Sequence, residues 1–336
     1  MNELPILGVL LGNSAGVGPE LVAKLAVNNY YADHCRPVII GDLRMFERGL
    51  QVVGGDVPHY VIDSMDQCDW DRGFPVLDTK DQDPAQVVYG EANAYCGASD
   101  LNQMNIAIGL CKAGKIEGFV FGPFHKGAMK MAGLHDESEH TYLAKAFGLT
   151  TPFCEVNMMD DLMTVRTTSH IPISDVSANI SETTLREAIE LGEITGETLG
   201  HKPRIAVAAL NPHCGEFGLC GREEVDVIQP TIEKVVAETG WNVTGPYSAD
   251  TLFIRALEGD FDVVVTMYHD QGQIALKLVG FKRCITVAGG QPYPIATCAH
   301  GTAFDKVGTG TAATDSFERA VKTAAKMAVA KRAKMA

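Results

Sequence analysis

The chain has 336 residues, of which 46% are hydrophobic and 21% charged, an ordinary composition for a globular protein with one or two domains. Its formal net charge of −14 would repel a phosphate backbone, so we expect no nucleic-acid partner. No run of about 18 apolar residues occurs, and we therefore expect no membrane span.

Short apolar runs alternate with helical stretches along the chain. We predict strands at 5–12, 36–41, 118–122, 204–210, 262–268 and 284–288. We predict helices near 43–50, 100–113, 182–195, 222–238 and 316–331. Runs that are apolar on both faces are typical of a mostly parallel sheet covered by helices on each side. The polar, aspartate-rich stretch 66–85 is predicted to be a long surface excursion.

The N-terminal region and the cysteines indicate the compartment. The apolar run Leu4–Leu11 is short and follows Glu3, which favours a first strand over a signal peptide. The nine cysteines are irregularly spaced and form no CxxC pair, so we expect buried free thiols in a reducing compartment. These features predict a soluble, cytoplasmic protein.

The turn from Gly12 to Glu20 follows the first predicted strand and opens a helix. Its glycines would let the backbone approach a ligand, and a helix N-terminus favours anions. The spacing is not that of the dinucleotide fingerprint G-x-G-x-x-G, and no acidic residue ends a later strand to bind a ribose. The pattern therefore favours a structural turn.

Four polar segments that include a histidine are interpreted as strand ends, and three of them follow an apolar run. They are 168–172, 211–213, 268–272 and 300–305. In an open α/β sheet this is the edge where ligands bind. Although one histidine at a strand end is more often a hydrogen-bonded polar residue than a ligand, the imidazoles of His170, His213 and His269 could together hold a divalent metal.

Two further residues near His269 have a possible chemical role. Asp270 is adjacent in sequence and could orient a metal-bound imidazole or accept a proton. Lys277 follows eight residues later among apolar neighbours. It either extends from a buried helix face or binds an anionic group of a substrate, and the residues alone leave both interpretations open.

Taken together, these segments resemble the 4-hydroxythreonine-4-phosphate dehydrogenase family of pyridoxine biosynthesis over nearly the whole chain. The matching motifs are Gly18-Pro19-Glu20, His140-Thr141, 168–172, 211–213, Gly221-Arg222-Glu223-Glu224, 249–253, 267–272 and 300–305. The combination is specific, whereas each motif alone is not.

The resemblance implies an isocitrate/isopropylmalate dehydrogenase-like fold of two α/β domains with the active site in the cleft between them. We expect a discontinuous first domain at 1–139 plus 300–336. A second domain at 140–299 would carry the metal-binding histidines and the interface of a homodimer.

The resemblance also implies roles for individual residues. His170, His213 and His269 match ligands of a divalent metal such as Zn, Mg, Co or Mn, with His269 contributed by the other subunit. His140, Thr141 and Lys277 match positions that contact the substrate. The loop at 300–305 is similar to the adenosine-binding loop of isopropylmalate dehydrogenases, and its matching NAD contacts are His300, Gly301, Thr302, Ala303 and Asp305.

The chain departs from the family pattern at three places. Asn13-Ser14 replaces Asp-Pro, Thr286 replaces an asparagine that binds substrate, and Ile295 replaces an arginine that binds substrate. The last change matters most, because a guanidinium group suits a phosphate and isoleucine carries no charge.

We therefore predict an NAD- and metal-dependent dehydrogenase that oxidises a secondary alcohol near a carboxylate. Asp250 or Asp270 would accept the proton, and Lys277 would bind the anionic group of a small hydroxy acid, phosphorylated or not. Decarboxylation would follow if the new carbonyl lay β to a carboxylate.

Three alternatives remain open. The same chemistry could act on an unphosphorylated substrate, such as a carboxylated aromatic cis-dihydrodiol. A three-histidine metal site could instead activate water in a hydrolase. The third alternative is a non-catalytic ligand-binding homologue, for which Thr286 and Ile295 are the indication.

Overall fold

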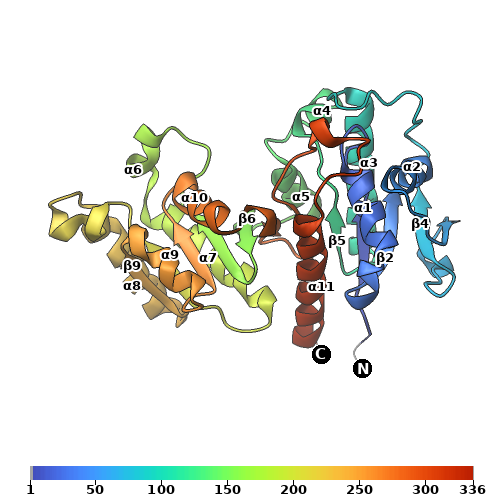
Figure 1. Cartoon of the computed structure of the whole chain (residues 1–336). Helices are drawn as coiled ribbons and strands as arrows, with labels where there is room; N and C mark the ends of the chain where they lie inside the picture. The colour runs from blue at the N-terminus through green and yellow to red at the C-terminus, as the bar shows by residue number, and fades with distance from the viewer. Residues whose placement is uncertain (1–2, 336) are drawn as a thin grey trace. The chain divides into compact units, whose positions relative to one another are not determined.

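The computed structural model describes residues 3–335. They form two compact units (Figure 1). The first contains residues up to 149, 285–287 and those from 291 onward, and the second contains 150–284 and 288–290. The assignment of domains at 1–139 plus 300–336 and at 140–299 stays a prediction.

The first unit is built on a sheet with the strand order β3-β4-β2-β1-β5-β12-β11. All neighbouring strands in it run parallel except β11 and β12, which are antiparallel. The bounds are β1 (Ile6–Leu10), β2 (Arg36–Gly41), β3 (His59–Ile62), β4 (Phe74–Asp78), β5 (Gly118–Phe121), β11 (Cys284–Gly289) and β12 (Ile295–Cys298). The predicted mostly parallel α/β fold is confirmed.

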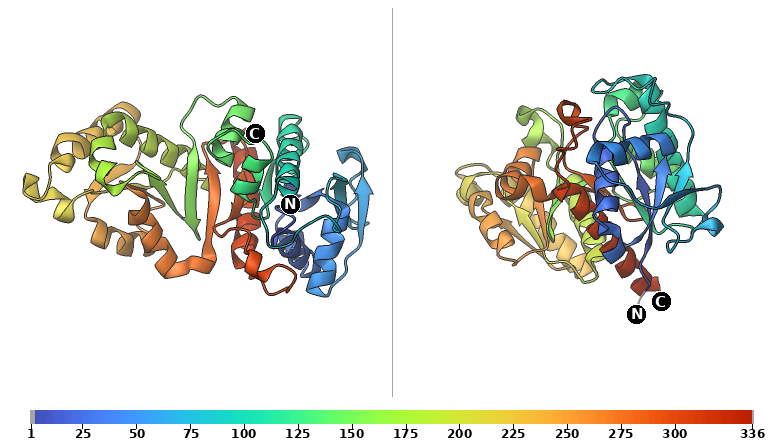
Figure 2. Two further views of the ribbon diagram at one scale, coloured as in Figure 1. Left: turned by 90° about the horizontal axis from the view of Figure 1, so that it is seen from above. Right: turned by 45° about the vertical axis from the view of Figure 1, so that its right-hand side comes forward.

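Helices cover both faces of this sheet. They are α1 (Gly18–Val27), α2 (Leu43–Val53), α3 (Ala94–Lys112), α4 (Lys126–Met131), α5 (Glu139–Phe147) and α11 (Asp315–Met335). Helix α1 packs against α2, and α3 packs against α4. Figure 2 shows the two pairs on opposite sides of the sheet.

The prediction of a surface excursion at 66–85 is wrong in its middle part. Strand β4 lies there, between β3 and β2, and Val76 is fully buried. The apolar run Phe74–Leu77 is short, contains Pro75 and is surrounded by aspartates, which hides it in the composition of the segment. Tertiary pairing with two neighbouring strands outweighs these local signals.

The second unit has the strand order β6-β7-β10-β8-β9. Only β6 and β7 are antiparallel. The strand bounds are β6 (Cys154–Met159), β7 (Leu162–Arg166), β8 (Ile205–Ala208), β9 (Val243–Tyr247) and β10 (Val263–Thr266). The helices are α6 (Val176–Asn179), α7 (Glu182–Gly196), α8 (Gln229–Thr239), α9 (Ala249–Leu257) and α10 (His269–Gly280).

Helices α7 and α10 lie on opposite faces of the second sheet. Gly192 of α7 lies over Val263, whereas Gly272 of α10 lies over Thr266 and Thr164. Successive side chains of a strand point to opposite faces, so residues 263 and 266 mark different sides. The sheet is therefore buried between helices, as the apolar strands predict.

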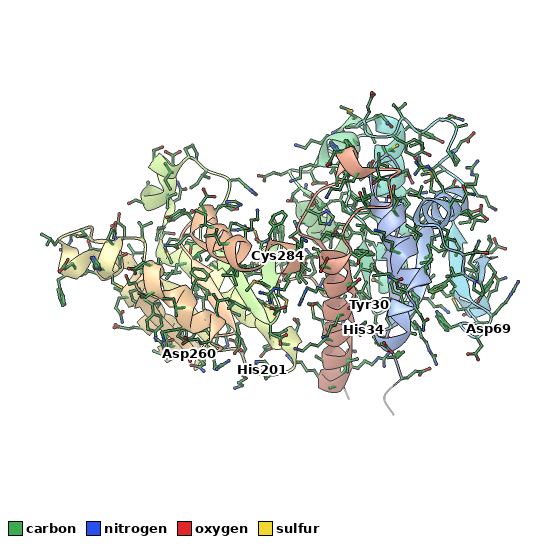
Figure 3. The ribbon with its side chains drawn as sticks, in the orientation of Figure 1. Tyr30, His34, Asp69, His201, Asp260 and Cys284 are labelled. Atoms are coloured by element: carbon green, nitrogen blue, oxygen red, sulfur yellow. The ribbon has the colours of Figure 1, made fainter. Side chains whose placement is uncertain are left out.

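The first turn of the C-terminal helix α11 is hydrogen-bonded to the segment that follows α1. Tyr30 and His34, labelled in Figure 3, lie with ring centroids 4.6 Å apart. The Tyr30 hydroxyl donates to the carbonyl of Glu318 at 3.1 Å. Burial and nearby Lys322 lower the pKa of His34, which favours the neutral imidazole in this cluster.

The membrane and cysteine predictions can be compared with the described residues. Within 3–335, no helix combines the length and apolar character needed to cross a bilayer. All nine cysteines are free thiols. Five of them are buried, namely Cys35, Cys96, Cys111, Cys284 and Cys298.

The Gly12–Glu20 turn is held by hydrogen bonds within the first unit. The N–H of Asn13 donates to the carbonyl of Pro123 at 3.1 Å, and that of Val17 donates to Thr302 at 3.0 Å. The Gly16 N–H donates to Asn13 at 3.0 Å. Three backbone donors of the turn are thus already used within the first unit, which supports the structural interpretation.

A buried carboxyl group lies behind this turn. Asp100 on α3 accepts hydrogen bonds from the Asn13 side-chain amide at 2.7 Å and from the His125 N–H at 3.3 Å. Asp100 is fully buried, and burial raises its pKa to about 8. The asparagine that departs from the family pattern therefore supplies a hydrogen-bond donor to this carboxyl group.

The pKa of Asp100 predicts a pH effect on stability. The pKa of Asp100 is higher in the folded state than in the unfolded state, so the protonated group stabilises the fold. Its contribution to the free energy of unfolding is complete below about pH 4 and is lost as the pH rises through about 8. The loss is at most about 1.4 kcal/mol per pH unit. We expect Asp100→Asn to flatten the stability profile between these limits. Urea unfolding of both proteins from pH 5 to 9 measures the difference, and parallel profiles would contradict the assignment.

Candidate active site

The loops that follow β7 and β10 are held side by side at the carboxyl edge of the second sheet. The N–H of Thr167 donates to the carbonyl of Thr266 at 2.8 Å. The Thr168 N–H and hydroxyl both donate to the carbonyl of Met267, at 3.1 and 2.7 Å. The ladder thus continues beyond the strands and places the two following segments next to each other.

A pocket of about 480 Å³ lies between these segments. It is lined by Thr168, Ser169, His170, Ile171, Ile173, Val176, Tyr268, His269 and Asp270. The rings of His170 and His269 have centroids 5.5 Å apart and are tilted by 40°. Two of the three predicted metal-binding histidines therefore share one pocket.

Asp270 orients one of the two imidazoles. Its Oδ1 lies 2.7 Å from Nδ1 of His269. In the tautomer with hydrogen on Nδ1, the N–H group donates a hydrogen bond to this carboxylate. The lone pair of Nε2 is then available to a ligand. This pair has the arrangement that supports histidines in metal sites.

The pocket wall also contains a buried hydroxyl group. Within the described part of the chain, Oγ of Ser169 is buried and has no hydrogen-bond partner. Buried polar atoms are nearly always paired, so this oxygen indicates a polar ligand or an ordered water. Sequence reasoning quoted Ser169 only as part of a motif, since serine after a strand is common.

His213 lies apart from this pocket. It follows β8 in the short helical segment η5 (Pro212–Gly218) and does not line the pocket. Among residues 3–335, no three side chains of His, Cys, Asp or Glu are grouped closely enough to hold a metal ion. The pocket of the described chain thus holds two of the expected imidazoles, His170 and His269. The three-histidine site, with His269 contributed by another subunit, stays a prediction.

The other candidates of the second unit are exposed. Asp250 lies in the first turn of α9 and accepts from the Ser248 hydroxyl at 2.7 Å. Lys277 lies on α10, about 12 Å along the helix from His269 at 1.5 Å per residue. Ile274 and Leu278 beside it are also exposed, so the face is not buried within this chain.

The cofactor-loop candidates lie in the first unit. The carbonyl of Thr302 is bonded to the Gly12–Glu20 turn, and Phe304 stacks on His125 at 5.1 Å with an interplanar angle of 3°. Gly301 and Asp305 are exposed, and His300 and Ala303 are half-buried. The contact of His125 with this loop has no signal in the sequence.

The buried carboxylate of Glu20 holds the segment after this loop. It accepts from the N–H groups of Gly308 at 2.5 Å and Gly310 at 3.2 Å. Lys24, one turn later on α1, donates to the carbonyl of Ala312 at 2.6 Å. The Gly-Pro-Glu motif thus fixes the chain that follows the candidate cofactor loop.

The substrate candidates of the first unit differ in their surroundings. His140 and Thr141 lie in the first turn of α5, where the Ser138 hydroxyl caps the helix by accepting from the Thr141 N–H at 3.2 Å. Thr286 on β11 is buried. Ile295 begins β12, pairs with Phe119 and is fully buried, so it is a core residue in the described chain.

Comparison with known proteins agrees with the family resemblance. The model of the family "Pyridoxal phosphate biosynthetic protein PdxA" matches residues 33–324, and the chain belongs to this family. A Pseudomonas aeruginosa protein, provisionally named 4-hydroxythreonine-4-phosphate dehydrogenase 2, is 41% identical over 97% of each chain.

A second relative and a solved structure extend this comparison. D-threonate 4-phosphate dehydrogenase from Cupriavidus necator is 35% identical and covers 97% of this chain and 98% of its own. The crystal structure of 4-hydroxythreonine-4-phosphate dehydrogenase from Klebsiella pneumoniae is 30% identical with a TM-score of 0.86, over 96% of this chain and 99% of its own. The relatives are named dehydrogenases, which supports an oxidoreductase acting on CH–OH groups.

The Glu20 anchor predicts a local change in dynamics. We expect Glu20→Gln to remove one of the two N–H acceptors at a cost of about 1.5–3 kcal/mol, because a hydrogen bond to a charged acceptor is lost. Amide hydrogen exchange should then become faster at Gly308 and Gly310 and stay unchanged in α8. Glu91→Gln, at an exposed position, is the control. Unchanged exchange at both glycines would contradict the anchor.

Proposed function

We propose that this protein is an NAD- and divalent-metal-dependent dehydrogenase that oxidises a secondary alcohol near a carboxylate. One observation carries the proposal: His170 and His269 line one pocket at a sheet edge where ligands bind, with Asp270 orienting the second imidazole. Family membership supports the same chemistry, since the relatives compared here are named dehydrogenases.

The donor set of the pocket suits a divalent metal in part. It offers two imidazoles, one of them with its Nδ1 already bonded to a carboxylate. His213 would complete a three-imidazole site if one histidine came from a second subunit. When bound by these residues, the ion would lower the pKa of the substrate hydroxyl while NAD accepted the hydride.

Residues of the chain would handle the proton and the substrate. Asp270 is favoured over Asp250 as the proton acceptor, because Asp270 lines the pocket and a carboxylate keeps further lone pairs after binding His269. Lys277 would bind the anionic group of the substrate. The half-buried His300 and the exposed Asp305 would contact the adenosine part of NAD.

The names of the relatives support a substrate class. Both 4-hydroxythreonine 4-phosphate and D-threonate 4-phosphate are phosphorylated hydroxy acids, and we propose this class for the present chain. Ile295 favours one alternative, because a buried uncharged residue cannot bind a phosphate. An unphosphorylated hydroxy acid, such as a carboxylated cis-dihydrodiol, is therefore the second candidate.

We also propose a homodimer through the surface next to the pocket. Ile274, Leu278 and Phe281 follow one another at helical spacing and are 57%, 81% and 57% exposed. Ile173, which lines the pocket, is 72% exposed. A second copy of the chain would cover this apolar stripe and contribute one of the three imidazoles.

An NADH-release screen tests the proposed function. We expect NADH formation with 4-hydroxythreonine 4-phosphate or D-threonate 4-phosphate, loss of activity after chelation and recovery with a divalent ion. Turnover of only the unphosphorylated dihydrodiol carboxylate would transfer the assignment to the second candidate. No NADH with any of these substrates, metal present, would contradict the proposed function.

The dimer is tested by adding a charge to the apolar stripe. Leu278→Lys should shift the protein from dimer to monomer in analytical ultracentrifugation, because a buried unpaired charge is costly in an interface. Val88→Lys, at an exposed apolar residue of the first unit, should leave the dimer intact. A wild-type protein that sediments as a monomer at micromolar concentration would overturn the proposal.

A further inference from the structure

The segment that carries His213 has a left-handed backbone. The φ angles are positive from His213 to Gly218, and four of these residues are not glycine. Such conformations cost an L-residue about 1–2 kcal/mol each and persist where the surroundings impose them. Packing does not hold the tip of the segment, because Phe217 is 99% exposed.

The side chain of Glu224 constrains the backbone just before the left-handed segment. Its Oε1 accepts from the N–H groups of Leu210 at 2.8 Å and Asn211 at 2.7 Å. Its Oε2 accepts from the Asn211 side-chain amide at 3.0 Å. Glu224 is only 3% exposed, so these charge-assisted bonds are shielded from water. They fix the two residues that precede Pro212-His213.

A second carboxylate and two glycines complete the arrangement. Oε2 of Glu223 accepts from the same Asn211 amide at 2.7 Å. A Cβ at Gly221 would lie 2.3 Å from the Asn211 amide nitrogen, and one at Gly215 would lie 2.7 Å from Oε2 of Glu224. Both glycines also have positive φ. The turn can therefore close on the carboxylate only because these residues lack side chains.

We propose that Glu224 is a positioning residue for His213. Its carboxylate fixes the backbone at Leu210 and Asn211, immediately before the left-handed segment. The position of these two residues sets the direction of the His213 imidazole toward the metal. The proposal rests on the proposed function, in which His213 is a metal ligand. It gives a role to the Gly221-Arg222-Glu223-Glu224 motif, which touches neither the pocket nor the cofactor loop.

A purely structural role for Glu224 must be distinguished from positioning. Asp262 provides a matched control in the same unit. It is a buried carboxylate that accepts from the Arg204 N–H at 2.8 Å and from the guanidinium at 3.0 and 2.9 Å. Asp262 lies just before β10, at the opposite end of the strands from the pocket. His201 contacts it at 3.5 Å. The labels of His201 and Asp260 mark this end of the strands in Figure 3.

The experiment is a Co²⁺ titration of the purified full-length protein, followed by the visible absorption of the bound ion. We expect Glu224→Gln to weaken Co²⁺ binding about 10–100-fold, as removal of a group that orients a ligand does. Asp262→Asn should lower the melting temperature while its Co²⁺ affinity and spectrum stay those of wild type. If Glu224→Gln does not fold, Asn211→Ala, which keeps the backbone bonds, should weaken binding in the same direction.

The outcomes separate this inference from the proposed function. The positioning role alone would be overturned if Glu224→Gln bound Co²⁺ with wild-type affinity while His213→Ala bound it more weakly. Asn211→Ala replaces Glu224→Gln in this comparison if the latter does not fold. A wild-type protein that does not bind Co²⁺, or a His213→Ala variant that binds it unchanged, would overturn the metal site itself and this inference with it.

Discussion

The candidate site depends on the hydrogen bonds that continue the β7–β10 ladder past the ends of the strands. Bonds from Thr167 and Thr168 to Thr266 and Met267 align two loops that are about 100 residues apart in sequence. His170 and His269 follow directly after these bonds, and their rings come within 5.5 Å. The same edge of a parallel sheet is where α/β proteins bind ligands, so fold and chemistry coincide here.

Much of the fold follows from the sequence because most strands are apolar on both faces. The runs that form β1, β2, β8 and β10 are short, rich in apolar residues and flanked by turn residues, which predicts strands of a covered sheet. Strand β4 was not predictable in this way, since its neighbours are polar and its order comes from pairing with two strands. Strand β12 is similar: its residues follow a Gly- and Pro-containing segment, and only its pairing with β5 and β11 defines it.

The site was predictable in its residue types and only partly in its geometry. Histidines at strand ends indicated an imidazole pocket, and adjacency indicated the His269–Asp270 pair, which the structure shows. The position of His213 outside the pocket lining has no sequence signal. His213 lies in a left-handed segment, and Asn211, just before it, is bonded to a carboxylate thirteen residues away. The anchoring of Gly308 and Gly310 by Glu20 spans nearly 290 residues and is likewise visible only in three dimensions.

The proposed function requires that three imidazoles bind one divalent ion. X-ray absorption spectroscopy of the zinc-loaded protein tests it most directly. We expect nitrogen and oxygen neighbours at about 2.0–2.1 Å with the multiple-scattering pattern of about three imidazole rings per ion. Sulfur neighbours at about 2.3 Å, or a shell of oxygen without imidazole scattering, would contradict it.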